Sequence, residues 1–244
     1  DAPLGEVWGV GRKLQAHLGA LGVKTAWDLA QQDAWTMRKQ FSVVLEKTIR
    51  ELRGEPCFAL DEGPEPKQMI TCSRSFSRRV TELAPLREAV ASYACRAAEK
   101  LRAQGDVCQL LQVYIRTGVF NPDEPRYART ASVPLHTPSN DSRDLVQAAL
   151  AGLEGIYRPG YRYQKAGVML MNLASPGQVQ ADLFAPAPRP RSAALMATVD
   201  RINTNMGRGT VRLARVPALG GWSMKQELRS PGYTCRWDEL PRVR

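Results

Sequence analysis

Two glycines near the start of the chain have the spacing of a phosphate-binding turn. They flank one valine in Val7-Trp8-Gly9-Val10-Gly11, between two short helical patterns. Glycine permits a tight hairpin whose backbone amides stay exposed, and amides at the start of a helix attract anions. An ordinary helical hairpin with glycine at its turn is the alternative. The nucleic-acid contacts expected here are Gly9, Val10, Gly11, Arg12 and Lys13.

Basic and hydroxyl side chains form a second candidate site, in strand-like segments between residues 69 and 175. Arginine and lysine neutralise phosphates, and serine donates hydrogen bonds to them, without reading base sequence. Cations on exposed strand positions also serve solubility and edge protection, which is the alternative. The DNA contacts expected in these segments are Ser73, Arg74, Ser75, Arg78, Arg79, Arg116, Arg129, Arg162 and Lys165.

A short peptide within residues 176–191 is a third candidate. It lies between proline-containing stretches, and it places leucine next to phenylalanine in a polar tether. Two large apolar residues in such a tether cannot easily join a core, so the pattern favours a peptide that docks into another protein. A loop anchor folded against its own domain is the alternative. The docking residues expected are Gln180, Asp182, Leu183 and Phe184.

No catalytic or metal site is expected in this chain. It contains no His-Glu-x-x-His, no Walker loop and no Gly-x-Ser-x-Gly. A two-metal nucleotidyl-transfer site needs clustered carboxylates, and the only adjacent acidic pairs are Asp61-Glu62, Asp123-Glu124 and Asp238-Glu239. Reduced thiols of a cytoplasmic protein are expected, because the cysteines lack the spacing of a zinc site. They are Cys57, Cys72, Cys95, Cys108 and Cys235.

Residues 1–57 are expected to form a small all-helical domain. Thr25, Asp33 and Ser42 each precede a helical pattern and are predicted N-caps. A linker over residues 58–68 should follow, because two prolines and a glycine lie close together there.

Residues 69–175 have the pattern strand, helix, strand, strand, helix, strand. The expected strands are 69–80, 110–116, 127–135 and 161–170, and the expected helices are 85–104 and one capped by Asp141 or Ser142. This order predicts an α+β fold with a four-stranded sheet and two helices on one face. We expect the basic strand residues on the opposite, open face. A tether over 176–191 and a small C-terminal module over 192–244 complete the predicted organisation.

Positive charge is concentrated late in the chain, whose net charge is +10. Residues 1–66 carry 8 Lys and Arg against 10 Asp and Glu, whereas residues 67–175 carry 15 against 9 and residues 186–244 carry 11 against 4. A basic chain is a candidate for binding nucleic acid or anionic membrane. No apolar run approaches the ~20 residues of a bilayer span, so we expect no membrane partner. The acidic helical domain must hold DNA through backbone amides and a few cations such as Arg12 and Lys13.

Five stretches, taken in order, resemble the UmuC-type Y-family translesion DNA polymerases. They are Val7 to Gly11, Glu51 to Cys57, Cys72 to Phe76, Arg162 to Val168 and Gln180 to Phe184. The resemblance implies a thumb in the helical domain and a DNA-gripping little finger in the sheet domain. It also implies a clamp-binding peptide in the tether and a UmuC-type C-terminal domain in the tail. Primer–template DNA and a sliding clamp are the implied partners, with UmuD′ and a recombinase filament as further ones.

The implied activity is template-directed nucleotide addition past lesions, in the SOS response and at a cytoplasmic, nucleoid-associated location. Such chemistry uses two metal ions. The carboxylates that bind Mg²⁺ belong to a palm expected to precede Asp1, so we expect a fragment of a longer protein that binds no cofactor itself. Ala181 stands where the family frequently has leucine. A non-catalytic DNA- and clamp-binding adaptor is the alternative, and a helix-hairpin-helix glycosylase or nuclease is a weaker one that the sheet pattern argues against.

Overall fold

The computed structural model describes residues 2–59, 66–178, 189, 191–218, 220–224, 228 and 230–240. Its internal contacts divide the chain into two compact units, Asp1–Glu65 and Pro66–Arg244. We call them the helical unit and the sheet unit and describe each by itself. None of the described helices is long and apolar enough to cross a membrane.

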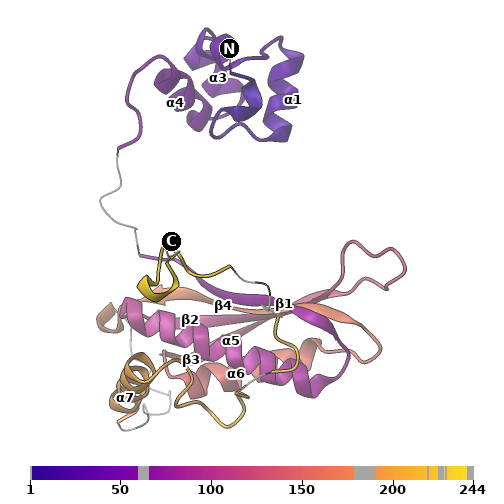
Figure 1. The fold of residues 1–244 in the computed structure, drawn as a ribbon, viewed down its shortest axis with the longest axis vertical. Coiled ribbons are helices and arrows are strands. Elements are labelled where there is room, and N and C mark those ends of the chain that lie inside the picture. The colour runs from indigo at the N-terminus through magenta and orange to yellow at the C-terminus, as the bar shows by residue number, and fades with distance from the viewer. Residues whose placement is uncertain are drawn as a thin grey trace. The chain divides into compact units, whose positions relative to one another are not determined.

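The described part of the helical unit, residues 2–59, contains four α-helices and a short 3-10 turn, Leu4–Glu6 (Figure 1). The helices are α1 (Arg12–Ala20), α2 (Ala26–Ala30), α3 (Ala34–Gln40) and α4 (Val43–Leu52). Their small core includes the fully buried side chains of Leu4, Leu18, Leu29 and Ile49.

All three predicted N-caps of the helical unit are confirmed. Thr25 Oγ1 accepts from Asp28 N while Asp28 Oδ2 accepts from Thr25 N, both at 3.0 Å, which is a capping box. Asp33 accepts from Thr36 N at 2.7 Å, and Ser42 accepts from Leu45 N at 3.2 Å. Each cap satisfies an amide that the helix itself leaves free.

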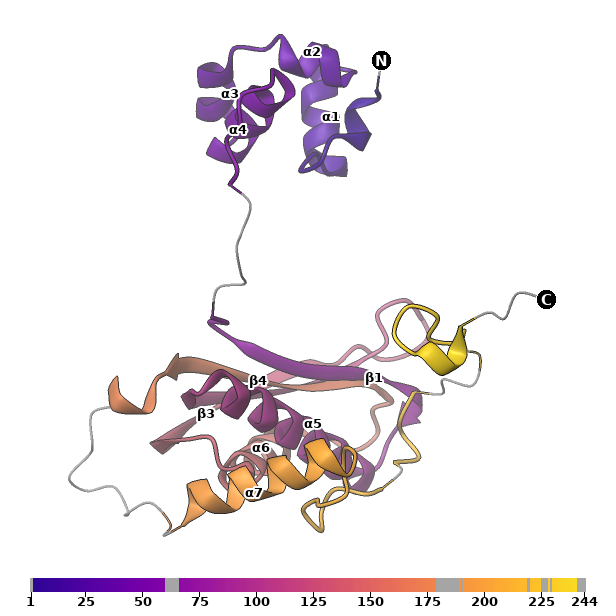
Figure 2. The ribbon, with the colours of Figure 1, turned by 60° about the vertical axis from the view of Figure 1, so that its left-hand side comes forward.

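The sheet unit has the predicted order β1 (Ile70–Val80), α5 (Leu83–Gln104), β2 (Val107–Thr117), β3 (Ala128–Ser139), α6 (Ser142–Ile156) and β4 (Tyr163–Ala174). The four strands form one antiparallel sheet with spatial order β1-β4-β2-β3. α5 packs on β1 and β4, and α6 packs on β2 and β3. Figure 2 shows both helices on the same side of the sheet. The α+β prediction, with two helices on one face, is confirmed.

Element boundaries differ from the predictions mainly at strand ends. β3 continues past Leu135 to Ser139, although Pro134 and Pro138 lie within it. Proline is tolerated there because β3 is an edge strand, where an unpaired position needs no amide donor. Of the two predicted caps of α6, Asp141 is confirmed, because its Oδ1 accepts from Arg143 N at 2.8 Å.

The C-terminal segment packs onto the sheet unit. It begins with α7 (Ser192–Asn205) and includes a short 3-10 helix, Trp237–Glu239. Between them, Leu213, Val216 and Trp222 contact the core of the sheet unit. Trp222 O accepts from Ser77 N of β1 at 3.2 Å, so this segment also covers part of an edge strand.

Candidate nucleic-acid interface

The glycine hairpin of the helical unit exposes backbone at its turn. Gly9 has a φ of 90°, a left-handed conformation that favours glycine. Gly11 is the N-cap of α1 and provides no side-chain cap, so the first amides of this helix remain available to an anion. Arg12 and Lys13 are exposed beside them, whereas Val10 is 7% exposed and anchors the turn in the core. Only the backbone of Val10 can therefore contact a ligand.

Trp8 lies in the same hairpin and is 94% exposed. The sequence interpretation omitted it from the candidate contacts. Its position in the turn, between Val7 and Gly9, could have indicated exposure, because a large aromatic side chain at a tight turn has little room to reach the core.

The strand register defines the open face of the sheet unit. Residues directly opposite each other in neighbouring strands point to the same face. One row across β1, β4 and β2 contains Ser75, Lys165 and Arg116, and the next contains Ser73, Gly167 and Tyr114. The helices cover the other face, where Val168 and Val113 are fully buried. We call the row of Ser75, Lys165 and Arg116 the cation row.

Tyr114 lies across Gly167 on this open face. A Cβ at Gly167 would be 2.6 Å from Tyr114 Cζ and 2.5 Å from Ser73 Cβ, so no larger residue fits without displacing them. The half-buried Tyr114 was not among the predicted contacts. Alternation along β2 could have found it, because Leu111, Val113 and Ile115 alternate with polar positions that include Tyr114 and Arg116.

The expectation that all the basic strand residues share the open face is wrong for Arg74 and Arg129. Arg74 is opposite Ala166, which is fully buried, and Arg129 is opposite Ile115, which is 1% exposed. Both positions therefore belong to the helix-covered face, at edge strands where a long side chain can reach solvent. The period of two along a strand decides the face, and charge alone does not reveal it.

Two other predicted contacts are paired with an acid. Glu124, in the connection between β2 and β3, lies 3.0 Å from Arg79 Nε and 3.7 Å from Arg162 Nη1. The carboxylate is 8% exposed, so it partly neutralises both guanidinium groups from a buried position. Arg78 lies beside Gly221 of the C-terminal segment. The predicted docking peptide, Gln180 to Phe184, lies outside the described residues.

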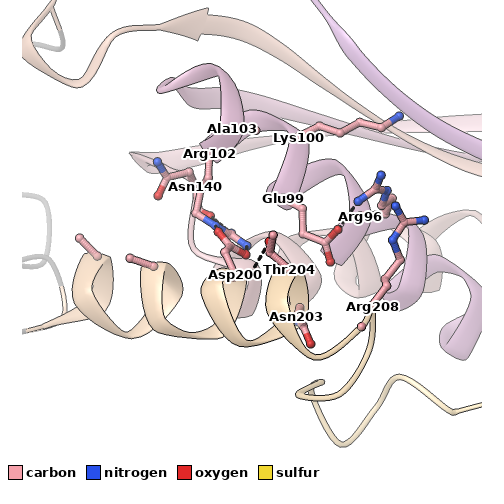
Figure 3. Close-up of a pocket in the computed structure, with 13 residues that line it drawn as sticks. Arg96, Glu99, Lys100, Arg102, Ala103, Asn140, Asp200, Asn203, Thr204 and Arg208 are labelled. Carbon is pink, nitrogen blue, oxygen red and sulfur yellow. Dashed lines mark hydrogen bonds and ion pairs between the residues drawn. The ribbon is translucent and has the colours of Figure 1, made fainter.

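Another basic region lies between α5 and α7, in a hollow of about 760 Å³ (Figure 3). Here Arg102 donates two hydrogen bonds to Asp200, at 2.6 and 2.7 Å, and its side chain is only 10% exposed. Arg96 pairs with Glu99 in the same hollow. The Arg102–Asp200 pair joins α7 to α5 across the hollow, while Lys100 and Arg208 also line it and take part in no ion pair among the described residues.

A buried carboxylate reinforces the start of α7. Asp141 is 3% exposed, and burial alone would raise its pKa. Hydrogen bonds from Arg143 and from Ser192 outweigh that effect and lower the pKa of Asp141 to about 2. This cluster ties the first residue of α7 to the start of α6.

Groups that could form a metal centre are absent from the described residues: no three or more His, Cys, Asp or Glu side chains come together. The five cysteines are all free.

Comparison with known proteins gives matches along the chain. Residues 67–183 match the impB/mucB/samB family C-terminal domain, and residues 193–243 match a domain of unknown function, DUF4113. The chain is 49% identical to Protein UmuC of Salmonella typhimurium (strain LT2), over 99% of this chain and 58% of that protein. It is 43% identical to Protein MucB of Escherichia coli, over 98% of this chain and 56% of that protein.

A more distant match is DNA polymerase IV of Desulfatibacillum aliphaticivorans, which is 25% identical over 87% of this chain and 52% of that protein. The chain spans between half and three fifths of the length of these curated relatives. Residues 67–183 thus belong to the impB/mucB/samB family C-terminal domain, and the chain is a C-terminal portion of the UmuC type.

Proposed function

We propose that this chain is the DNA-gripping and clamp-binding portion of a Y-family DNA polymerase that acts in translesion synthesis and SOS repair. The observation that carries the DNA-binding role is the cation row. Arg116 is directly opposite Lys165 on the open face, and like charges in that arrangement destabilise a sheet. Among the described residues, neither side chain takes part in an ion pair. A phosphate bound between them would relieve the repulsion.

The surroundings of the cation row fit a sugar–phosphate backbone. Ser75 continues the row on β1, and Ser73, Tyr114 and Thr130 lie in the adjacent row. Hydroxyl groups and cations of this kind contact phosphates without reading base sequence. Sequence-independent binding is what a polymerase needs as it moves along its template.

The relatives support the polymerase assignment, since one is named DNA polymerase IV and another Protein UmuC. In this proposal the palm and its Mg²⁺-binding carboxylates belong to a part of the protein beyond the present chain. The exposed amides at Gly9 and Gly11 supply a second phosphate contact. UmuD′ and a recombinase filament are proposed as further partners on the strength of the family resemblance.

The test is binding of the 244-residue chain to primer–template DNA, measured by fluorescence anisotropy at several salt concentrations. The affinity should fall steeply with salt, with a log–log slope of about −0.9 for each phosphate neutralised. Arg116→Gln combined with Lys165→Gln should weaken binding at least tenfold and reduce the steepness of the slope by about 2.

The matched control is Arg201→Gln, because Arg201 is an exposed cation on α7, away from the open face. It should leave affinity and slope unchanged. Affinity that does not depend on salt, or an equal effect of the control and the double variant, would contradict the proposal.

The clamp-binding part has its own test. Leu183→Ala with Phe184→Ala should abolish binding to a sliding clamp and leave DNA affinity intact. Unchanged clamp affinity would remove the peptide from the proposal. The alternative is a non-catalytic adaptor that binds DNA and the clamp. The gene sequence upstream of Asp1 distinguishes the two, because the polymerase assignment requires it to encode palm strands that carry carboxylates.

A further inference from the structure

The connection between β2 and β3 presents an aromatic side chain almost entirely to solvent. Phe120 is 96% exposed, and its neighbour Val119 is 48% exposed. Figure 1 shows this connection extending past the end of the sheet. A large apolar side chain at a loop tip contributes nothing to the core, and loop residues of this kind commonly serve binding.

The base of this loop is firmly held. Thr117 N donates to Tyr127 O at 2.9 Å, and Tyr127 N donates to Thr117 Oγ1 at 2.9 Å, which closes the two strand ends. Tyr127 Oη donates to Ile156 O at the end of α6, at 2.6 Å. The loop is therefore fixed both to the sheet and to a helix.

The inner side of the loop is fixed by charge. The 8% exposed carboxylate of Glu124 connects it to Arg79 at the end of β1 and to Arg162 just before β4. Gly118 is packed so closely that a Cβ there would be 2.8 Å from Arg79 Nη2. A rigid base lowers the entropy lost when the tip binds a partner, which favours a recognition role for Phe120.

The charges around the loop indicate an anionic partner. The cation row lies at the same end of the sheet, because Arg116 is the penultimate residue of β2 and Lys165 is near the start of β4. Within the loop, the exposed cation Arg126 is offset by the exposed acid Asp123, so the positive charge near the loop comes from the cation row. A partner that offers negative charge to these residues and a flat apolar surface to Phe120 has the chemistry of a nucleotide chain.

We propose that Phe120 stacks on an unpaired base of the template strand while the cation row holds the adjacent phosphates. An unpaired base is required because bases inside a duplex already stack on one another and do not present a free π-face. This inference rests on the proposed DNA-binding function and adds to it a specific preference for DNA with a single-stranded template extension.

The experiment compares two DNA ligands with the full 244-residue chain, a primer–template with a single-stranded extension and a blunt duplex of the same paired length. Phe120→Ala should weaken binding to the extended DNA about fivefold or more, and leave the blunt duplex unaffected. Phe120→Leu should weaken it to a similar degree, because leucine keeps the apolar volume and lacks the π-face. Phe120→Tyr should preserve the affinity.

Trp237→Ala is the control, since Trp237 is an exposed aromatic (90%) elsewhere in the same unit. Circular dichroism should be used to check that each variant is folded. If the unchanged chain binds neither ligand, the proposed function fails. If it binds both with the expected salt dependence but Phe120→Ala binds the extended DNA equally well, the stacking proposal alone is overturned. Equal losses for the blunt duplex, or full affinity of Phe120→Leu, would also overturn it.

Discussion

The helical unit and the sheet unit differ in what they leave free to contact a phosphate. In the helical unit, Glu46 pairs with Arg38 at 3.0 Å and with Arg50 at 2.8 Å, and Arg53 donates to Ala30 O at 2.7 Å. Arg38 joins α3 to α4 and Arg53 connects the end of α4 to the end of α2, whereas the Arg50 pair lies within α4. What remains at the hairpin is backbone amide, with Arg12 and Lys13 beside it.

In the sheet unit the groups that remain available to contact a phosphate are charged side chains. The cation row stands on a flat face that no described residue neutralises, while Arg79 and Arg162 are drawn toward Glu124. The difference shows that the net charge of a segment does not reveal which of its cations lack an acidic partner. In the proposed function, DNA affinity depends on the number of cations without an acidic partner more than on the net charge of the unit.

The largest effect on stability should come from Trp222, which packs within the sheet unit. Trp222 packs edge-on against Phe76 and Tyr93, with ring centroids 6.3 and 5.6 Å away. Trp222→Ala should lower the free energy of unfolding of the sheet unit by about 2–4 kcal/mol, because it removes this packing and leaves a cavity. Hydrogen exchange measured by mass spectrometry would follow the two units separately. The control Trp237→Ala should leave the protection of both units unchanged. If Trp222→Ala lowered the protection of the helical unit as much as that of the sheet unit, the two units would not be independent.

The amide site can be tested at Gly9. Gly9→Ala places a side chain at a φ of 90° and should lower the stability of the helical unit by about 1–2 kcal/mol. It should also weaken DNA binding without changing the salt slope, because amides carry no net charge. Gly19→Ala is the control and should raise the stability of the helical unit. Gly19 lies within α1, where alanine is favoured over glycine, and a Cβ there meets nothing within 4 Å. A changed salt slope in Gly9→Ala would show that cations, and not amides, act at the hairpin.

Acid should affect the sheet unit more than the helical unit. The pKa of Asp141 in the folded chain is about 2, below its ordinary value of 3.8. Its stabilising contribution is therefore present above pH 4 and is lost as the pH falls toward 2, by about 1–2 kcal/mol. In the helical unit the carboxyls of Asp28 and Asp33 also have lowered pKa values, from hydrogen bonds at their helix caps. Both are more accessible to water than Asp141, so screening makes their contributions to stability smaller. Urea unfolding should give a lower free energy of unfolding for the sheet unit at pH 2.5 than at pH 5. This difference should be smaller in Asp141→Asn.

Much of the fold followed from local signals in the sequence. Thr25, Asp33 and Ser42 were identifiable as caps because their chemistry is local, and the order of strands and helices followed from periodicity. The assignment of cations to faces failed for Arg74 and Arg129, because a face depends on register within a sheet. The roles of Glu124 and Trp222 depend on contacts between residues far apart in the chain, and no local pattern indicates them.

The smallest expected effect on stability is that of Lys165→Gln in the cation row, where stability and DNA affinity should change in opposite directions. Lys165→Gln should raise the free energy of unfolding of the sheet unit by about 0.2–1 kcal/mol, because it removes the repulsion from Arg116 on the neighbouring strand. The same change should weaken DNA binding, so stability and affinity should move in opposite directions. In 1 M salt the gain in stability should shrink, because the screening length falls to about 3 Å and Arg116 is exposed, although Lys165 is half-buried. Arg201→Gln should change neither quantity. A loss of stability in Lys165→Gln would mean that the lysine is held by attraction within the chain, and the sheet unit would then resemble the helical unit in using its cations for its own fold.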